Sequence, residues 1–163
     1  MWNILGIPMK FLRRSLTVAS ILAISFFSVE VGLAADSDRG WQTDYKAALA
    51  QAAKENKYVL LDFTGSDWCM ACIQLKKDLF SQPEFTEFAD KNLVLVEVDF
   101  PNNKMQSDFV IAQNQALQQR YMVEGFPTLF LLNPEGKAVN RHVGYLPGGP
   151  EAFIAWVKKS QKK

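Results

Sequence analysis

The fold is decided by the stretch Tyr58-Val-Leu-Leu-Asp-Phe-Thr-Gly-Ser-Asp-Trp-Cys69-Met-Ala-Cys72. Its first part, residues 59–63, is apolar except for Asp62 and rich in strand-forming residues, which predicts a strand buried on both faces. The polar segment Thr64–Asp67 predicts a turn, and residues 73–80 have the pattern of a helix. The two cysteines therefore stand where a buried strand passes into the N-terminus of a helix.

This position gives the two cysteines a predictable chemistry. Unpaired N–H groups at a helix N-terminus favour negative charge, which would lower the pKa of Cys69 and stabilise its thiolate. Cys72 follows one turn later, within reach of a mixed disulfide at Cys69, so the spacing indicates thiol–disulfide exchange. Leu75 and Leu79 share a helix face with Cys72, so we expect Cys72 to point inward and Cys69 outward.

Two other interpretations of the cysteine pair remain. The first is a structural disulfide, although a bridge across so short a loop constrains the unfolded chain little. Half a zinc site is the second, but zinc prefers four ligands and His142 is the only histidine in the sequence. We expect His142 to be an ordinary exposed strand residue, and we expect neither a metal nor another cofactor.

Two motifs together resemble a known family. A Trp68-Cys-x-x-Cys72 motif after a buried strand, with a later Gly125-Phe-Pro-Thr128, resembles the thioredoxin superfamily. More narrowly, Thr64-Gly-Ser-Asp-Trp-Cys-Met-Ala-Cys72 in a chain with a secretion signal is similar to the DsbH-type periplasmic thiol–disulfide oxidoreductases. The resemblance covers about residues 41–160. It implies a thioredoxin fold, an α/β domain whose mixed central sheet is flanked by helices on both faces.

The resemblance implies a substrate-binding role for Phe126 and Pro127. In thioredoxin-like proteins the matching proline is cis and faces the cysteines, and the backbone before it binds a substrate strand. A proline before a strand is otherwise commonly a strand-entry residue. Beside the sulfur atoms, Pro127 would also discourage a metal.

Three residues around Cys69 are also assigned to substrate binding. Trp68 resembles the apolar platform of the family, a role compatible with simple packing. Met70 and Ala71 lie between the cysteines and would tune the stability of the Cys69 thiolate, hence the redox potential. Neither adds a charge, and strong oxidants of this superfamily commonly have a histidine there. This favours a reductase or isomerase.

Asp62 resembles the buried acid of thioredoxin, which accepts the proton of the resolving thiol. Burial would raise the pKa of Asp62 and suit it to that role, whereas an acid at a wet sheet edge would have no such function. The chain departs from thioredoxin twice. Asp62 lies seven residues before Cys69, one more than in thioredoxin, and Leu95 stands where thioredoxin has a lysine partner.

Residues 1–35 have the pattern of a signal peptide, which leaves residues 36–163 as a thioredoxin-like domain. The apolar run 16–29 leads to small residues that allow cleavage after Ala34 or Ala35, and it is preceded by Lys10, Arg13 and Arg14. An uncleaved anchor is the alternative, but the run is shorter than the roughly 20 apolar residues of a spanning helix. We expect export to the periplasm. Met9 is a more usual signal start than Met1.

Hydrophobic periodicity predicts the remaining elements. Thr43 is expected to cap the first helix, and the spacing Ser81-Gln-Pro-Glu84 is that of a capping box. Connecting helices predict parallel strands, and the turn 133–136 predicts a final antiparallel return. Apolar residues Phe109, Ala112, Ala116, Leu117 and Tyr121 mark the helix before the third strand. The expected elements are helices 43–56, 73–80, 109–120 and one from Pro150, a short helix after Ser81, and strands 59–63, 93–98, 128–132 and 138–143.

Composition places few further limits on function. The chain has 163 residues, 48% of them apolar, and a net charge of +1, which fits one domain and gives no indication of nucleic-acid binding. We therefore expect a monomeric exported enzyme that exchanges its Cys69–Cys72 disulfide with cysteine-containing exported proteins and is recycled by a membrane redox partner. The alternative is a thioredoxin-like peptide-binding module with incidental redox activity.

Overall fold

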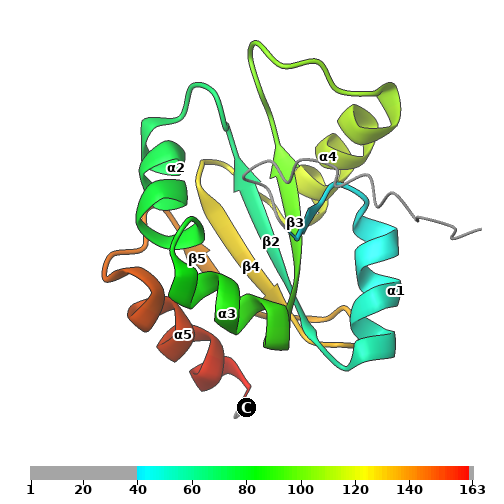
Figure 1. Ribbon diagram of the computed structural model, residues 1–163. Coiled ribbons are helices and arrows are strands. Elements are labelled where there is room, and N and C mark those ends of the chain that lie inside the picture. The colour runs from blue at the N-terminus through cyan, green and yellow to red at the C-terminus, as the bar shows by residue number, and fades with distance from the viewer. Residues whose placement is uncertain (1–39, 162–163) are drawn as a thin grey trace, which may run out of the picture. The chain divides into compact units, whose positions relative to one another are not determined.

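One mixed sheet of five strands organises the structure, a computed structural model that describes residues 40–161 (Figure 1). The predicted signal peptide lies outside the described residues. The elements in chain order are β1 (Trp41–Gln42), α1 (Tyr45–Glu55), β2 (Tyr58–Thr64), α2 (Met70–Leu75), the π-helical turn η1 (Lys76–Phe80), α3 (Pro83–Asn92), β3 (Leu93–Asp99), α4 (Asp108–Arg120), β4 (Thr128–Leu132), β5 (Ala138–Val143) and α5 (Gly149–Ser160).

The strand that carries the cysteine motif is the centre of the sheet. The strand order is β1-β3-β2-β4-β5, and β2 is buried at every position after Tyr58. This confirms the prediction of a strand buried on both faces. β2 and β1 both pair parallel to β3, while β5 returns antiparallel to β4 as the turn predicts. The short strand β1 was not predicted, because two residues carry no periodicity.

The prediction that strands connected by a helix are parallel is wrong for β4, which runs antiparallel to β2. The two strands are antiparallel, with Thr128 opposite Phe63, and Phe63 is also paired with Val98 near the end of β3. β3 therefore ends, and β4 begins, at the same end of the sheet. The connection through α4 leaves from that end and returns to it, so it does not act as a crossover. As a result, Pro127 lies beside the end of β2, where the cysteine motif begins.

The helices cover both faces of the sheet. Figure 1 shows α1 and α4 on one face, and α2, α3 and α5 on the other. Side chains alternate along β2, so Val59, Leu61 and Phe63 pack in the cluster with α1, whereas Leu60 packs under α2, α3 and α5. By the same alternation, Asp62 shares the face of Leu60. This places the buried acid on the side of the sheet that the cysteine helix covers.

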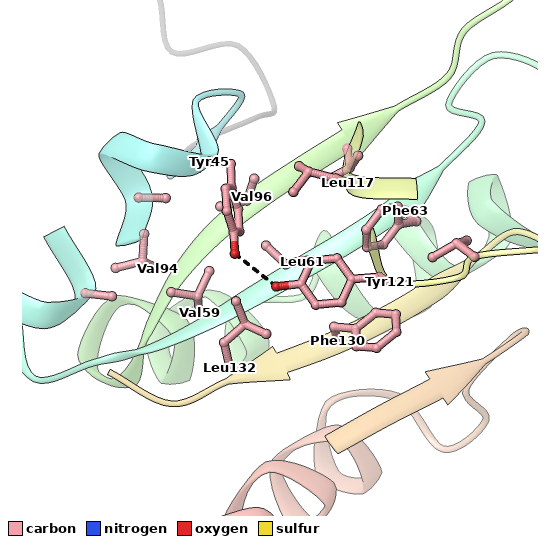
Figure 2. Packing of buried hydrophobic residues seen from close by; sticks show 14 residues of the cluster. Tyr45, Val59, Leu61, Phe63, Val94, Val96, Leu117, Tyr121, Phe130 and Leu132 are labelled. Atoms are coloured by element: carbon pink, nitrogen blue, oxygen red, sulfur yellow. Dashed lines mark hydrogen bonds between the residues drawn. The ribbon is translucent and has the colours of Figure 1, made fainter. Parts of the chain in front are cut away.

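A pair of tyrosines joins α1 to the end of α4 within the apolar cluster on the α1 face of the sheet. Tyr45 begins α1, and its hydroxyl lies 2.9 Å from the hydroxyl of Tyr121, which directly follows α4 (Figure 2). Burial, and then this hydrogen bond, raise the pKa of Tyr121. The Arg120 guanidinium carbon lies 5.6 Å from the Tyr121 ring centroid. The bond satisfies both hydroxyl groups within an otherwise apolar core.

Three predicted helix boundaries need correction. The N-cap of α1 is Asp44 rather than Thr43, because the Asp44 carboxylate accepts the N–H of Ala47 at 3.0 Å. The capping box at Ser81 is absent: Gln82 precedes α3 and makes no side-chain cap. The cysteine helix begins at Met70 rather than at residue 73, and its last five residues form the π-helical turn.

The apolar residues that predict α4 do not all lie on its buried face. Leu117 is buried, but Phe109, Ala112 and Ala116 are exposed. The buried face includes Asn114, whose side-chain amide donates to the Asp99 carbonyl at 2.9 Å. A polar contact therefore joins the buried face of α4 to the end of β3.

Candidate functional site

The two cysteines form a disulfide at the start of α2. Cys69 is the N-cap of this helix, and its sulfur accepts the Cys72 N–H at 3.2 Å. Side-chain exposure hardly distinguishes the cysteines, since Cys69 is 8% and Cys72 4% exposed. In the disulfide form Cys69 is therefore buried, rather than exposed as an outward-pointing side chain would be. The two sulfurs differ instead in surroundings, because Cys72 also lines a cavity beneath the helix.

The turn before the cysteines is fastened to the loop after β3. The Asp67 carboxylate accepts the N–H groups of Asn102 and Asn103 at 2.9 and 2.6 Å, and these bonds lower the pKa of Asp67. Ser66 donates its N–H and hydroxyl to the two carboxylate oxygens of Asp99, at 2.8 and 2.5 Å. Residues 64–67 therefore hold two segments of the site together, a contact that sequence reasoning missed.

Gly65 is required where the turn meets the active-site tryptophan. A Cβ atom at this position would lie 2.5 Å from the indole ring of Trp68, which is closer than any real contact of that kind. The Gly65 carbonyl also accepts the N–H groups of Trp68 and Cys69, at 3.2 and 2.9 Å. The close approach of backbone and ring thus fixes the start of the motif.

Three aromatic rings form a platform beside the disulfide. The Trp68 indole N–H donates to the Phe100 carbonyl at 2.8 Å, and its ring meets Phe126 edge-on at a centroid distance of 6.0 Å. Phe100 stacks on Phe126 at 5.1 Å. Trp68 nevertheless stays 44% exposed and Met70 77% exposed, so the platform packs on one side and faces solvent on the other. The packing and binding interpretations of Trp68 are thus compatible.

The Phe126–Pro127 peptide bond is cis. Pro127 is buried, and its carbonyl accepts the Gly144 N–H at 2.8 Å. The next residue, Thr128, donates its hydroxyl to the Gly125 carbonyl at 2.7 Å. These bonds fix the segment that leads into the start of β4, at the same end of the sheet as the cysteines. Phe126 is half-buried and reaches the Trp68 ring from there.

Asp62 is buried beneath the cysteine helix. It lines a cavity of about 260 Å³ together with Cys72, Lys76 and Glu97, and within residues 40–161 its Oδ1 atom has no hydrogen-bond partner. Burial raises the pKa of Asp62 well above its ordinary value, the negative charges of Glu97 and Asp99 add to this rise, and Lys76 opposes it. The wet-edge alternative is wrong, because β2 is the central strand.

Sequence reasoning also missed Glu97 and Lys76, although one signal was present. Glu97 interrupts the apolar strand β3 as Asp62 interrupts β2, and the two residues are paired in the sheet. An acid in each of two adjacent buried strands indicates a shared polar site. Lys76 could not be found in this way, because the geometry of the helix decides whether its side chain faces the cavity.

His142 lies away from this site on β5. It is half-buried rather than fully exposed, and its Nε2 atom lies 3.3 Å from the Tyr145 carbonyl. Within residues 40–161 no cluster of three or more histidine, cysteine or acidic side chains could hold a metal ion.

Comparison with known proteins identifies the family. The family model described as a thioredoxin-like domain matches residues 45–161. The chain belongs to the thioredoxin-like family. Within this family it is similar to the disulfide bond reductase DsbH of Chlamydia pneumoniae, with 40% identity over 122 residues that span 75% of this chain and 72% of the relative.

Two further relatives agree with this assignment. A solved structure titled DsbH oxidoreductase is 39% identical, with a TM-score of 0.70, and the match covers 75% of this chain and 83% of that one. The thioredoxin-related protein DsbJ of Chlamydia pneumoniae is 30% identical over 74% of this chain, but the match spans only 35% of DsbJ. With the Cys69–Cys72 pair present, the chain is a DsbH-like thiol–disulfide oxidoreductase with a thioredoxin fold.

Between residues 40 and 161, none of the helices has the length and apolar character needed to cross a membrane.

Proposed function

We propose that this protein is an exported reductase or isomerase of protein disulfides. The observation that carries the proposal is the Cys69 sulfur at the start of α2, where it accepts the Cys72 N–H. A donor at this position stabilises a thiolate, which is the nucleophile of disulfide exchange. The uncharged Met70 and Ala71 between the cysteines, and the similarity to a disulfide bond reductase, support the reducing direction.

In the first step, the reduced Cys69 thiolate attacks one sulfur of a substrate disulfide. A Cys69–substrate disulfide forms, the substrate S–S bond breaks, and the second substrate sulfur leaves as a thiolate that takes a proton from solvent. The hydrogen bond from the Cys72 N–H supports Cys69, rather than Cys72, as the attacking sulfur.

In the second step, Cys72 resolves the mixed disulfide. Asp62 accepts the Cys72 proton across the cavity that both residues line, and the resulting thiolate attacks the Cys69 sulfur. The Cys69–Cys72 bond forms, and the second substrate thiolate leaves. Asp62 then returns its proton to solvent. The protein is now oxidised, and we infer that a membrane redox partner returns two electrons to it.

The exposed platform supports a substrate site around the disulfide. Trp68, Met70 and Ala71 would contact the substrate on the helix side, and Phe126 with cis-Pro127 would present backbone to a substrate strand. Main-chain recognition has little sequence preference, which suits a range of cysteine-containing exported proteins. We place the protein in the periplasm as a monomer, with residues 1–35 as its signal peptide.

The exposed Trp68 and Met70 also favour a second candidate, a peptide-binding module whose redox activity is incidental. Reduction of insulin by dithiothreitol separates the two. For the oxidoreductase we expect a catalysed rate that Cys69→Ser abolishes and that Cys72→Ser strongly reduces. A rate that is unchanged in both variants would favour the binding module. If the protein is an active enzyme, a glutathione equilibrium of the Cys69–Cys72 pair gives its redox potential and hence the direction of electron flow.

A further inference from the structure

The cavity beneath the cysteine helix contains more charge than the resolving step requires. Asp62 and Glu97 are paired on the parallel strands β2 and β3, so their side chains project from the same face of the sheet. Lys76 lines the same cavity from η1, one helical turn after Cys72. A carboxylate and an ammonium group thus flank the buried acid from opposite elements.

The charged and titratable groups that face Asp62 come from β3 and from the cysteine helix with its π-helical turn. β3 contributes Glu97 and Asp99, and the Asp99 carboxylate is engaged by Ser66. The helix side contributes Cys72, Lys76 and the exposed Lys77, which all line the same cavity. β4 contributes only the apolar Leu129, which is paired with Asp62. Glu97 and Lys76 are therefore the two half-buried charges that distinguish this cavity.

We propose that Glu97 and Lys76 are positioning residues that act on Asp62 with opposite sign, Glu97 favouring its protonated form and Lys76 its charged form. This inference rests on the proposed role of Asp62 in the resolving step. In that step the proton passes from the Cys72 sulfur to the Asp62 carboxylate, and the thiolate electron pair forms the bond to Cys69. Neither Glu97 nor Lys76 exchanges an electron pair in that step.

The physical reason is charge interaction in a poorly solvated place. A negative Glu97 makes a second negative charge at Asp62 less favourable, and a positive Lys76 compensates for it. Screening by water is weak at a buried carboxyl group, so both effects are stronger than they would be on the surface. The pair thus sets the pH range in which Asp62 can accept the Cys72 proton.

The experiment is a carbon-13 NMR titration of the Asp62 carboxyl group in the oxidised protein purified from its exporting host. For Glu97→Gln we expect the midpoint to fall by roughly 0.5 to 1 pH unit, and for Lys76→Gln to rise by a similar amount. Glu97→Asp keeps the charge and should stay near wild type. The controls Glu84→Gln and Lys54→Gln remove exposed charges on α3 and α1 and should not move the midpoint.

A second readout follows the resolving step itself. Release of a thiol from a preformed Cys69 mixed disulfide should slow at low pH, where Asp62 is already protonated. The pH of half-maximal rate should fall in Glu97→Gln and rise in Lys76→Gln.

Shifts of the same sign in both variants, or no shift in either, would overturn the inference whatever the activity. The proposed function has a separate test, because a wild-type protein without cysteine-dependent insulin reduction would refute it even where the two NMR midpoints move as expected.

Discussion

At the scale of single residues, the disulfide joins two cysteines that differ in surroundings rather than in exposure. Cys69 has the hydrogen bond from the helix N-terminus, while Cys72 shares a cavity with a buried acid. The sequence indicated the chemistry of the pair correctly, because the spacing and the helix start are local properties. It could not indicate how deeply each sulfur is buried, since burial depends on how segments distant in the sequence pack around the two cysteines.

The different roles of the two cysteines predict which variant traps substrates. In Cys72→Ser, the mixed disulfide at Cys69 has no internal resolving thiol, so adducts with exported proteins should accumulate. Cys69→Ser should trap few, because Cys72 has no comparable stabilisation of its thiolate. Non-reducing gels of periplasmic extracts measure both. Equal trapping by the two variants would contradict the assignment of Cys69 as the nucleophile.

At the scale of elements, the contact between the Thr64–Asp67 turn and the loop after β3 positions the aromatic platform. Asp67 holds the N–H groups of Asn102 and Asn103, and Phe100, next to that loop, stacks on Phe126. The turn is one residue longer than in thioredoxin, which sequence reasoning noted without a structural reason. The structure supplies one, because the Ser66 and Asp67 side chains both reach across to residues after Val98.

This contact predicts a selective loss of protein-substrate binding. In Asp67→Ala the loop loses two hydrogen bonds, so we expect KM for a protein disulfide to rise several-fold, while the rate with glutathione disulfide changes little. Asp67→Asn keeps one acceptor oxygen and should have an intermediate effect. The exposed Asp90→Ala on α3 is the control. An equal loss with both substrates would indicate damage to the cysteines instead of to the platform.

Most elements could be predicted from the sequence, but their relative directions could not. The strands at 59–63, 93–98, 128–132 and 138–143 are all present, because apolar runs and turn residues are local signals. The antiparallel direction of β4 was missed, because a helix between two strands usually marks a crossover, whereas α4 leaves and returns at one end of the sheet. The buried face of α4 was also missed, because a buried Asn114 is invisible to a hydrophobic pattern.

At the scale of the whole molecule, Asp62 makes stability depend on pH. The folded-state pKa lies well above the ordinary value of 3.8, so the folded protein binds more protons than the unfolded chain between these two values. The contribution to stability is complete below the ordinary value and is lost as the pH rises through the folded-state pKa. Charged Asp62 is therefore a cost at high pH.

This dependence predicts a stabilising substitution. Asp62→Asn removes the ionisable group, so we expect the oxidised protein to gain free energy of unfolding at high pH and to gain progressively less as the pH falls. Denaturant unfolding across the pH range measures the difference. The exposed Asp90→Asn is the control and should follow the wild-type curve. A constant difference at all pH values would show that Asp62 does not titrate on unfolding.

The buried carboxyl group across the cavity from Cys72 also has an electrochemical consequence. Reducing a disulfide to two thiols takes up two electrons and two protons, which lowers the midpoint potential by about 59 mV per pH unit. Asp62 adds a third titrating site within the same cavity. If the pKa of its carboxyl group differs between the oxidised and the reduced protein, a plot of midpoint potential against pH should deviate from that slope between the two pKa values. The acidity of the surroundings would therefore adjust the reducing power of the Cys69–Cys72 couple.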